Sequence, residues 1–375
     1  MVTDPSQVDA ASAAATSEDI SSVAATASDI SAHAPYTDLT PGGVLDALDG
    51  VGLRGDGRLI QLNSYENRVF QIFLEDGQVV VAKFYRPGRW TDAQILEEHA
   101  FATELAAAEI PVAAPWKLEA SADSLHRDDV GLLGPTLARF DTPTGAHRFA
   151  VCTRMAGRAP DLEDLPTLEW IGRFVGRLHA VGAAGRFAQR ETLDVATFGD
   201  ANRDRLLDAD IIPPDALTGW RDVTARALDQ VREAFERQGR LRTLRTHGDC
   251  HIGNILWTAA GPHFVDLDDT VTAPATQDLW MLLSGDGGAM TGQLAAVLDG
   301  YETFMDFDWR ELALIEPLRT LRIIHHSAWI ARRWEDPAFP IAFPWFESPA
   351  YWAEQTTRLR EQLVAMAEPP LGGAA

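Results

Sequence analysis

The sequence predicts an α+β fold of two lobes, in which a small antiparallel sheet precedes a mainly helical half. Short apolar runs separated by turn residues fill much of residues 37–152, whereas apolar residues recur at helical spacing after residue 158. Within the helical half, residues 247–266 contain two aspartates and an asparagine that lie next to apolar segments. With 375 residues, 46% of them apolar, the chain can bury a large core.

Composition excludes several classes of function. The formal net charge of −23 argues against a nucleic-acid partner and against docking on an anionic membrane. No apolar run is long enough to span a bilayer, and no Lys or Arg precedes Arg54, so we expect no membrane span and no secretory signal. The only cysteines are Cys152 and Cys250, which is typical of a reducing compartment. We therefore expect a cytoplasmic protein, and we take it to be a monomer.

The first half reads as a tail followed by a lobe of strands. Residues 1–36 are mostly Ala, Ser, Thr and Asp, which predicts a disordered acidic tail. Residues 37–152 form the first lobe, with Thr91 predicted to cap a helix that runs to Ala108. The other elements expected in this lobe are a helix at 41–53, strands at 59–62, 68–74, 79–85 and 148–153, and a polar loop or irregular hairpin at 121–146.

The second half reads as helical. We place a hinge at residues 153–157, a helical lobe at 158–368 and a frayed end at 369–375. Leu168, Ile171, Val175 and Leu178 recur at helical spacing. Residues 312–334 predict a long apolar helix that is interrupted near its start by a proline.

The most informative segment runs from His247 to Trp257 and is followed shortly by Asp266. Asp249, Asn254 five residues later and Asp266 at the end of an apolar strand have the order and spacing of a phosphotransfer site. In that chemistry Asp249 takes or orients a hydroxyl proton, while Asn254 and Asp266 hold Mg²⁺ under the phosphates of ATP. Asp266 is thus both a catalytic and a metal-binding candidate.

Neighbouring polar residues are expected to support this segment. We expect His247 to brace the loop and Asp278 to cap a helix or to accept hydrogen bonds from loop N–H groups. Asp268, two residues after Asp266, is predicted to cap a turn, with a supporting metal or water contact as the alternative.

The first lobe offers four candidates for binding ATP. Lys83 lies in a Val-Val-Val-Ala-Lys strand that is similar to the lysine strand of protein kinases, where a fixed positive charge meets the phosphates. Glu97 and Glu98 both lie on the next helix, and the usual kinase pattern favours Glu98 as the partner of Lys83. Ser64 and Asn67 lie in a turn without glycine, where short polar side chains and backbone N–H groups can bind phosphate oxygens.

Taken together these motifs resemble the bacterial stress response kinase A family. Gly248 and His251, where protein kinases have Arg and Lys, are similar to the aminoglycoside-phosphotransferase loop. The resemblance covers residues 40–370 and rests on residues 62–85, 85–99, 111–115, 247–257, 264–269, 277–283 and 332–340. It implies a serine/threonine protein kinase of the aminoglycoside-phosphotransferase type, acting in stress protection, with Asp249 as proton acceptor, Asn254 and Asp266 on magnesium and Ser64 on ATP.

Three functions remain open from the sequence. The first is transfer of the ATP γ-phosphate to Ser or Thr of proteins, including the protein itself. The second is a small-molecule kinase of the aminoglycoside, choline or homoserine kinase type, for which an acidic groove would favour a cationic substrate. The third, a non-catalytic nucleotide-binding protein, is disfavoured because Lys83, Asp249, Asn254 and Asp266 are all present.

Overall fold

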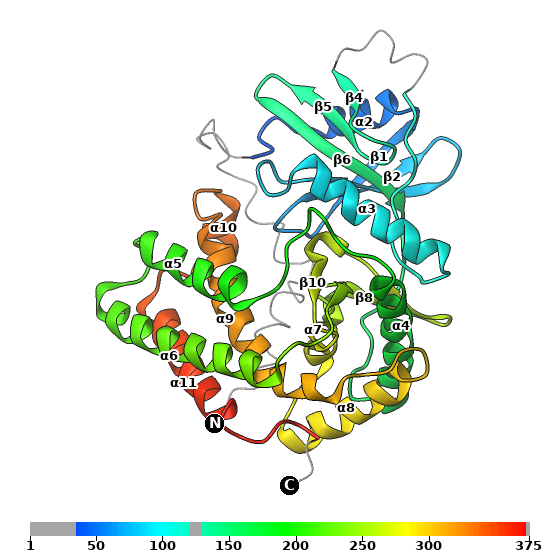
Figure 1. The fold of residues 1–375 in the computed structure, drawn as a ribbon. Coiled ribbons are helices and arrows are strands. Elements are labelled where there is room, and N and C mark those ends of the chain that lie inside the picture. Colours follow the sequence, from blue (N-terminus) through cyan, green and yellow to red (C-terminus); the bar gives the residue numbers. More distant parts are fainter. Residues whose placement is uncertain (1–34, 121–128, 373–375) are drawn as a thin grey trace.

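The computed structural model describes residues 35–120 and 129–372, which form the two predicted lobes (Figure 1). The N-terminal lobe is built on one antiparallel sheet of six strands in the order β1-β2-β3-β6-β5-β4. Its elements are α2 (Pro41–Gly50), β1 (Gly55–Leu62), β2 (Arg68–Leu74), β3 (Val79–Phe84), α3 (Asp92–Ala107), β4 (Val130–Leu132), β5 (Ala138–Thr142) and β6 (Gly145–Thr153). The α+β fold class is confirmed.

The C-terminal lobe is mainly helical and carries two short two-stranded sheets, β10-β7 and β8-β9. Its helices are α4 (Leu165–Ala183), α5 (Ala201–Asp208), α6 (Pro214–Gln238), α7 (Thr276–Leu279), α8 (Gly287–Tyr301), α9 (Ile315–Ala331), α10 (Ala338–Ala342) and α11 (Pro349–Ala365). The strands are β7 (Leu244–Thr246), β8 (Ile255–Thr258), β9 (Gly261–Phe264) and β10 (Val271–Ala273). None of the helices in the described part of the chain combines the length and the apolar character that a membrane span requires.

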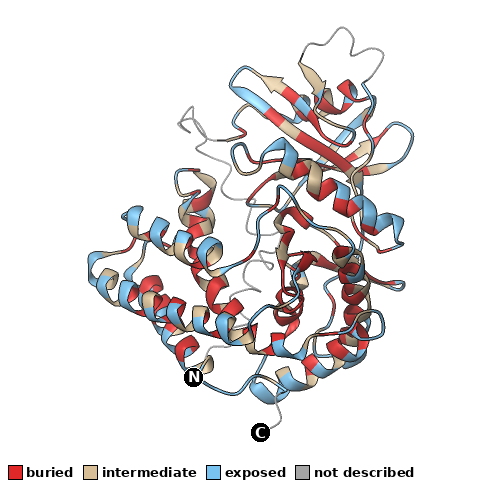
Figure 2. Cartoon of the chain, in the orientation of Figure 1, coloured by how far each residue is buried: buried red, intermediate tan, exposed pale blue. Residues whose placement is uncertain are grey.

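Helix α3 connects the cores of the two lobes. Thr91 caps it through a capping box with Gln94, as the sequence predicts. Ile95 in its first half packs with residues of the N-terminal lobe, whereas Phe101 and Leu105 in its second half belong to the core of the C-terminal lobe. The buried positions of α3 and α4 follow one side of each helix, whereas those of α9 cover most of its circumference (Figure 2). Helix α3 is therefore placed to hold the sheet against the helical lobe.

Residues 153–157, where we predict a hinge, lie in the segment that crosses between the lobes. Strand β6 ends at Thr153, and helix α4 begins only at Leu165. Gly157 passes so close to β8 that an added Cβ would lie 2.8 Å from the Cβ of Leu256. Only glycine allows this approach without a shift of the backbone.

Two details of the predicted elements differ in the structure. Tyr36, which we assigned to the tail, is buried in the N-terminal core and donates its hydroxyl to the carbonyl of Phe84 at 3.2 Å. The rest of the predicted tail, residues 1–34, lies outside the described residues. Helix α9 begins at Ile315 and tolerates Pro317, because the N–H groups of a first helical turn have no partner within the helix.

Candidate active site

The loop between β7 and β8 is held in place by the buried side chain of Asp278. Its carboxylate accepts hydrogen bonds from the backbone N–H groups of His247 at 2.7 Å and Gly248 at 2.8 Å. It also pairs with the ring of His179 at 2.9 Å, and both side chains are fully buried. The second of the two roles predicted for Asp278 is thus confirmed.

Gly248 occupies a position that only glycine can fill. Its φ is +85°, and an added Cβ would lie 2.0 Å from the carbonyl oxygen of Asp269. The close contact brings the loop that carries Asp249 against the segment that carries Asp266. The two segments are also joined by His247, whose Nε2 lies 3.0 Å from the carbonyl oxygen of Val265.

Asp249 follows this glycine, and the guanidinium of Arg322 and the imidazole of His251 flank its carboxylate. Nη1 of Arg322 from α9 lies 2.5 Å from its Oδ1, and Nε2 of His251 lies 3.4 Å from its Oδ2. Burial alone would raise the pKa of Asp249, but Arg322, together with His251 and His247, holds it well below its ordinary value. Asp249 is therefore ionised at neutral pH, while 19% of its side-chain surface remains exposed.

Asn254 is oriented by its own loop. Its Nδ2 donates to the carbonyl oxygen of Asp249 at 2.9 Å, so the Oδ1 atom points to the other side of the amide. Its carbonyl accepts the N–H of Val265 at 3.0 Å, which links this turn to the segment before Asp266.

Asp266 follows β9 in a left-handed conformation with φ +59°, which is uncommon for a residue other than glycine. The backbone then enters a 3₁₀ turn at Leu267–Asp269. Half of the side-chain surface of Asp266 is exposed, and its Oδ1 accepts a hydrogen bond from Lys83 at 2.8 Å. Unusual backbone angles of this kind occur preferentially at functional sites.

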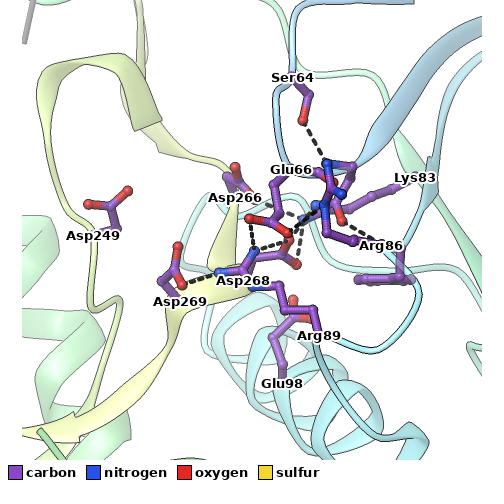
Figure 3. Close-up of polar contacts among 12 residues, drawn as sticks. Ser64, Glu66, Lys83, Arg86, Arg89, Glu98, Asp249, Asp266, Asp268 and Asp269 are labelled. Atoms are coloured by element: carbon purple, nitrogen blue, oxygen red, sulfur yellow. Dashed lines mark hydrogen bonds and ion pairs between the residues drawn. The ribbon is translucent and has the colours of Figure 1, made fainter. Parts of the chain in front are cut away.

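Lys83 reaches the same point from β3 in the N-terminal lobe (Figure 3). Its Nζ lies 2.8 Å from Asp266 and 2.7 Å from the buried Asp268. Burial opposes its charge, but these two carboxylates raise its pKa well above the ordinary value, so Lys83 carries its charge.

A second group of charges joins the lobes beside the turn at residues 62–67. Glu66, which is buried, accepts from Nε1 of Trp329 in the last turn of α9 at 2.7 Å and pairs with Arg333, just after the helix, at 2.5 Å. On the N-terminal side it pairs with Arg86 at 3.1 Å and Arg89 at 3.5 Å. We call Glu66 with these four partners the Glu66 cluster.

The chain is similar in sequence to known phosphotransferases over most of its length. Residues 58–315 match the phosphotransferase enzyme family. The chain is 42% identical over 338 residues to Stress response kinase A of Escherichia coli K12, which covers 90% of this chain and 96% of the relative. It is 41% identical over 336 residues, with the same coverage, to Serine/threonine protein kinase RdoA of Salmonella typhimurium LT2.

The chain belongs to the phosphotransferase enzyme family. Its sequence relatives confirm the predicted resemblance to stress response kinase A, and the protein is a kinase.

Solved structures of kinases share the fold. Amicoumacin kinase hAmiN, solved with AMP-PNP, Ca²⁺ and Ami, aligns with a TM-score of 0.65 and 18% identity over 88% of this chain and 93% of that one. A microcompartment-associated aminopropanol kinase aligns with a TM-score of 0.62 and 19% identity over 86% of this chain and 97% of that one.

The structure places two of the predicted ATP-binding residues differently. Lys83 pairs with Asp266 and Asp268 instead of Glu98, so the predicted Glu98–Lys83 ion pair is wrong for this structure. Glu98 is buried on α3 (Figure 3), and burial raises its pKa to about 7 against the opposing charge of Lys83.

Asn67 is the other correction. Its side chain is buried, donates to Asp268 and accepts from the N–H of Arg86 at 3.1 Å. It therefore holds the turn against Asp268 and does not present its side chain to a phosphate. Ser64 accepts the N–H of Asn67 at 3.3 Å and shapes the turn, which is compatible with the predicted role near ATP.

Sequence reasoning also missed part of the site. Glu97 accepts the N–H groups of three consecutive residues, Ala188, Gln189 and Arg190, and so ties α3 to the C-terminal lobe. The buried carboxylate of Asp268 pairs with Lys83 and accepts a hydrogen bond from Asn67, contacts that the prediction of a turn cap did not include. No pattern in the sequence predicts the contacts of Arg322 or of the Glu66 cluster, because the residues in contact are tens to hundreds of positions apart in the chain.

Proposed function

We propose that this protein transfers the γ-phosphate of ATP to Ser and Thr hydroxyls of proteins, including its own, in a Mg²⁺-dependent reaction, as a cytoplasmic monomer of bacterial stress protection. The observation that carries the proposal is the meeting of Lys83 from one lobe with Asp266 from the other, next to the loop of Asp249 and Asn254. The names of the relatives at 41–42% identity support a protein acceptor and a role in stress.

Each side chain has a role that its surroundings support. The hydroxyl oxygen of the acceptor attacks the γ-phosphorus, the bond to the β-phosphate oxygen breaks, and ADP leaves. The ionised Asp249 accepts the proton of the hydroxyl. Lys83 supplies a fixed positive charge to the phosphates, and backbone N–H groups of the turn at residues 62–67, which Ser64 shapes, bind the phosphate oxygens.

The donor set fits magnesium. Among residues 35–120 and 129–372, no group of three or more His, Cys, Asp or Glu side chains is arranged to hold a metal. The Oδ1 of Asn254 and the half-exposed carboxylate of Asp266 are hard oxygen donors, and Mg²⁺ commonly binds to one or two such ligands together with substrate phosphates. Bound there, Mg²⁺ would neutralise charge on the β- and γ-phosphates.

The acceptor class is tested by incubating the purified protein with Mg²⁺ and γ-labelled ATP. The acceptors are the protein itself, a generic protein mixture, amino alcohols and aminoglycosides, each with Asp249→Ala as the matched control. We expect acid-stable label on Ser or Thr of protein that is absent with the variant. Label found only on a small molecule would overturn the protein-kinase proposal in favour of a small-molecule kinase.

A further inference from the structure

One face of helix α9 extends from the proposed base to the turn at residues 62–67. Arg322 contacts Asp249 at one end, and Trp329 contacts Glu66 at the other. His325 and Arg332 recur on the same face, three and ten residues after Arg322. At 1.5 Å per residue, the face between Arg322 and Trp329 is about 10 Å long. The residues of this face therefore lie beside the position of the acceptor hydroxyl.

Arg322 competes with the acceptor for the proposed base. A general base must come within about 3 Å of the hydroxyl whose proton it takes. In this structure Oδ1 of Asp249 is instead 2.5 Å from the guanidinium of Arg322, while Oδ2 faces His251 and Asn254. A substrate that gave Arg322 another anion to bind would release Oδ1 for catalysis.

More arginines surround the same face. His325 stacks on Phe198 at a centroid distance of 5.0 Å. Burial lowers the pKa of His325 to about 3; Asp269 opposes this, whereas Arg332, Arg322 and Arg89 act in the same direction. The histidine is thus neutral and adds no positive charge of its own.

Arg332 shows that this positive charge is only partly balanced. It is exposed, and its side chain donates to the neutral amide oxygen of Asn202. Its pKa is lowered by burial of part of the side chain and by Arg205, with Arg89 adding to the repulsion and with Glu191 and Glu66 opposing it. We define Arg205, Arg322 and Arg332 as the arginine cluster. Arg89 is left out because Glu66, Asp268 and Asp269 already neutralise its charge. Such a cluster is unexpected in a chain of net charge −23.

We propose that the arginine cluster binds carboxylates on both sides of the acceptor residue, so that the substrate is a Ser or Thr within an acidic segment. Arg322 exchanges Asp249 for a substrate carboxylate, which couples recognition of the acidic segment to release of the base. The inference rests on the proposed function and adds the substrate class. It also disfavours the cationic substrates of the small-molecule alternative, because like charges at this position would repel.

The test uses three peptides that share one central serine and differ only in flanking residues, which are Asp, Ala or Arg. Phosphorylation is measured with the wild-type protein and with Arg322→Gln, Arg332→Gln and Arg360→Gln. Arg360 is exposed on α11 and serves as the matched control for loss of one positive charge. Binding of the same peptides with Ser replaced by Ala is measured by fluorescence anisotropy.

We expect kcat/KM of the wild-type protein to be at least about tenfold higher for the Asp-flanked peptide than for the Arg-flanked one, and to fall as salt is added. Arg322→Gln and Arg332→Gln should remove most of this preference by raising KM, whereas Arg360→Gln should retain it. Arg322→Gln should also shift the acidic limb of the pH–rate profile to higher pH, because Asp249 loses its main cationic partner.

Transfer to serine without a preference for acidic flanks would overturn the inference and leave the proposed function standing. No Asp249-dependent transfer to any peptide would overturn the proposed function. In that case the binding of the Ala-containing peptides tests the role of the arginine cluster separately. Tighter binding of the acidic peptide than of the basic one, lost in Arg322→Gln, supports recognition of acidic segments by the cluster. Equal binding of the acidic and basic peptides refutes that recognition.

Discussion

At the scale of single residues, spacing along the chain predicted the groups that perform chemistry but missed the groups that hold them. Asp249, Asn254 and Asp266 lie within 18 positions and in the order of a phosphotransfer site, so their pattern can be recognised in a single sequence. Arg322 is 73 positions from Asp249, and Asp268 is 185 positions from Lys83. No local periodicity encodes such contacts. The prediction that Glu98 pairs with Lys83 is wrong for a related reason. The register of a helix shows which face a side chain lies on, but it does not show which carboxylate a lysine on another element will contact.

The buried carboxyl of Glu98 gives a prediction about pH. Its pKa in the folded protein is about 7, above the ordinary 4.5, so the folded state binds the proton more tightly. Its contribution to the free energy of unfolding is therefore complete below about pH 4.5 and is lost as the pH rises through 7. Glu98→Gln should flatten this decline by up to about 3 kcal/mol between pH 5 and 8, as measured by urea unfolding.

The control for that experiment is Glu119→Gln, which alters an exposed glutamate. It should follow the wild-type pH dependence. A Glu98→Gln variant with the same slope as the wild type would show that Glu98 is already ionised in the folded protein at pH 5.

At the scale of elements, periodicity and turn signals predicted strand β2 at its observed bounds and the capped start of α3, because local patterns determine both. They did not place Tyr36, whose burial depends on the strands that it packs against. The loop between β7 and β8 shows how an element fixes a site: Asp278 holds its backbone, and Gly248 allows the contact with Asp269.

Gly248→Ala should therefore impair catalysis more than stability alone explains. The new Cβ must move away from the carbonyl oxygen of Asp269, which displaces Asp249 relative to Asp266. A displacement of about 1 Å at a reacting group can cost about a hundredfold in rate, so we expect kcat to fall at least about tenfold. Gly77→Ala is the matched control, since Gly77 has φ +87° and its added Cβ would meet nothing within 4 Å. Equal kcat in the two variants would contradict this account of the loop.

At the scale of the whole molecule, the sequence predicted the two-lobed fold, but not the Glu66 cluster that joins the lobes beside the turn at residues 62–67. Its members come from three separate segments of the chain, so no local pattern links them. The cluster places the end of α9 against the turn that is proposed to bind ATP.

Removal of Glu66 should weaken the association of the lobes. Glu66→Ala leaves Arg86, Arg89 and Arg333 without a shared carboxylate in a largely buried position. Loss of one partner of a buried ion pair typically costs about 3 to 5 kcal/mol, and we expect a decrease of that size in the free energy of unfolding. Glu75→Ala, in the exposed turn after β2, should change it by less than about 0.5 kcal/mol. Equal stability of the two variants would show that the cluster does not hold the lobes together.

The most direct test of the central claim is the turnover of Asp249→Asn with Mg²⁺ and γ-labelled ATP, measured beside its affinity for ATP. Asparagine keeps the size of the side chain but cannot accept the hydroxyl proton. If Asp249 is the base of a phosphotransfer site, kcat should fall about a hundredfold to ten-thousandfold while ATP still binds. Turnover within about threefold of the wild type would contradict the assignment of Asp249 and the reaction built on it.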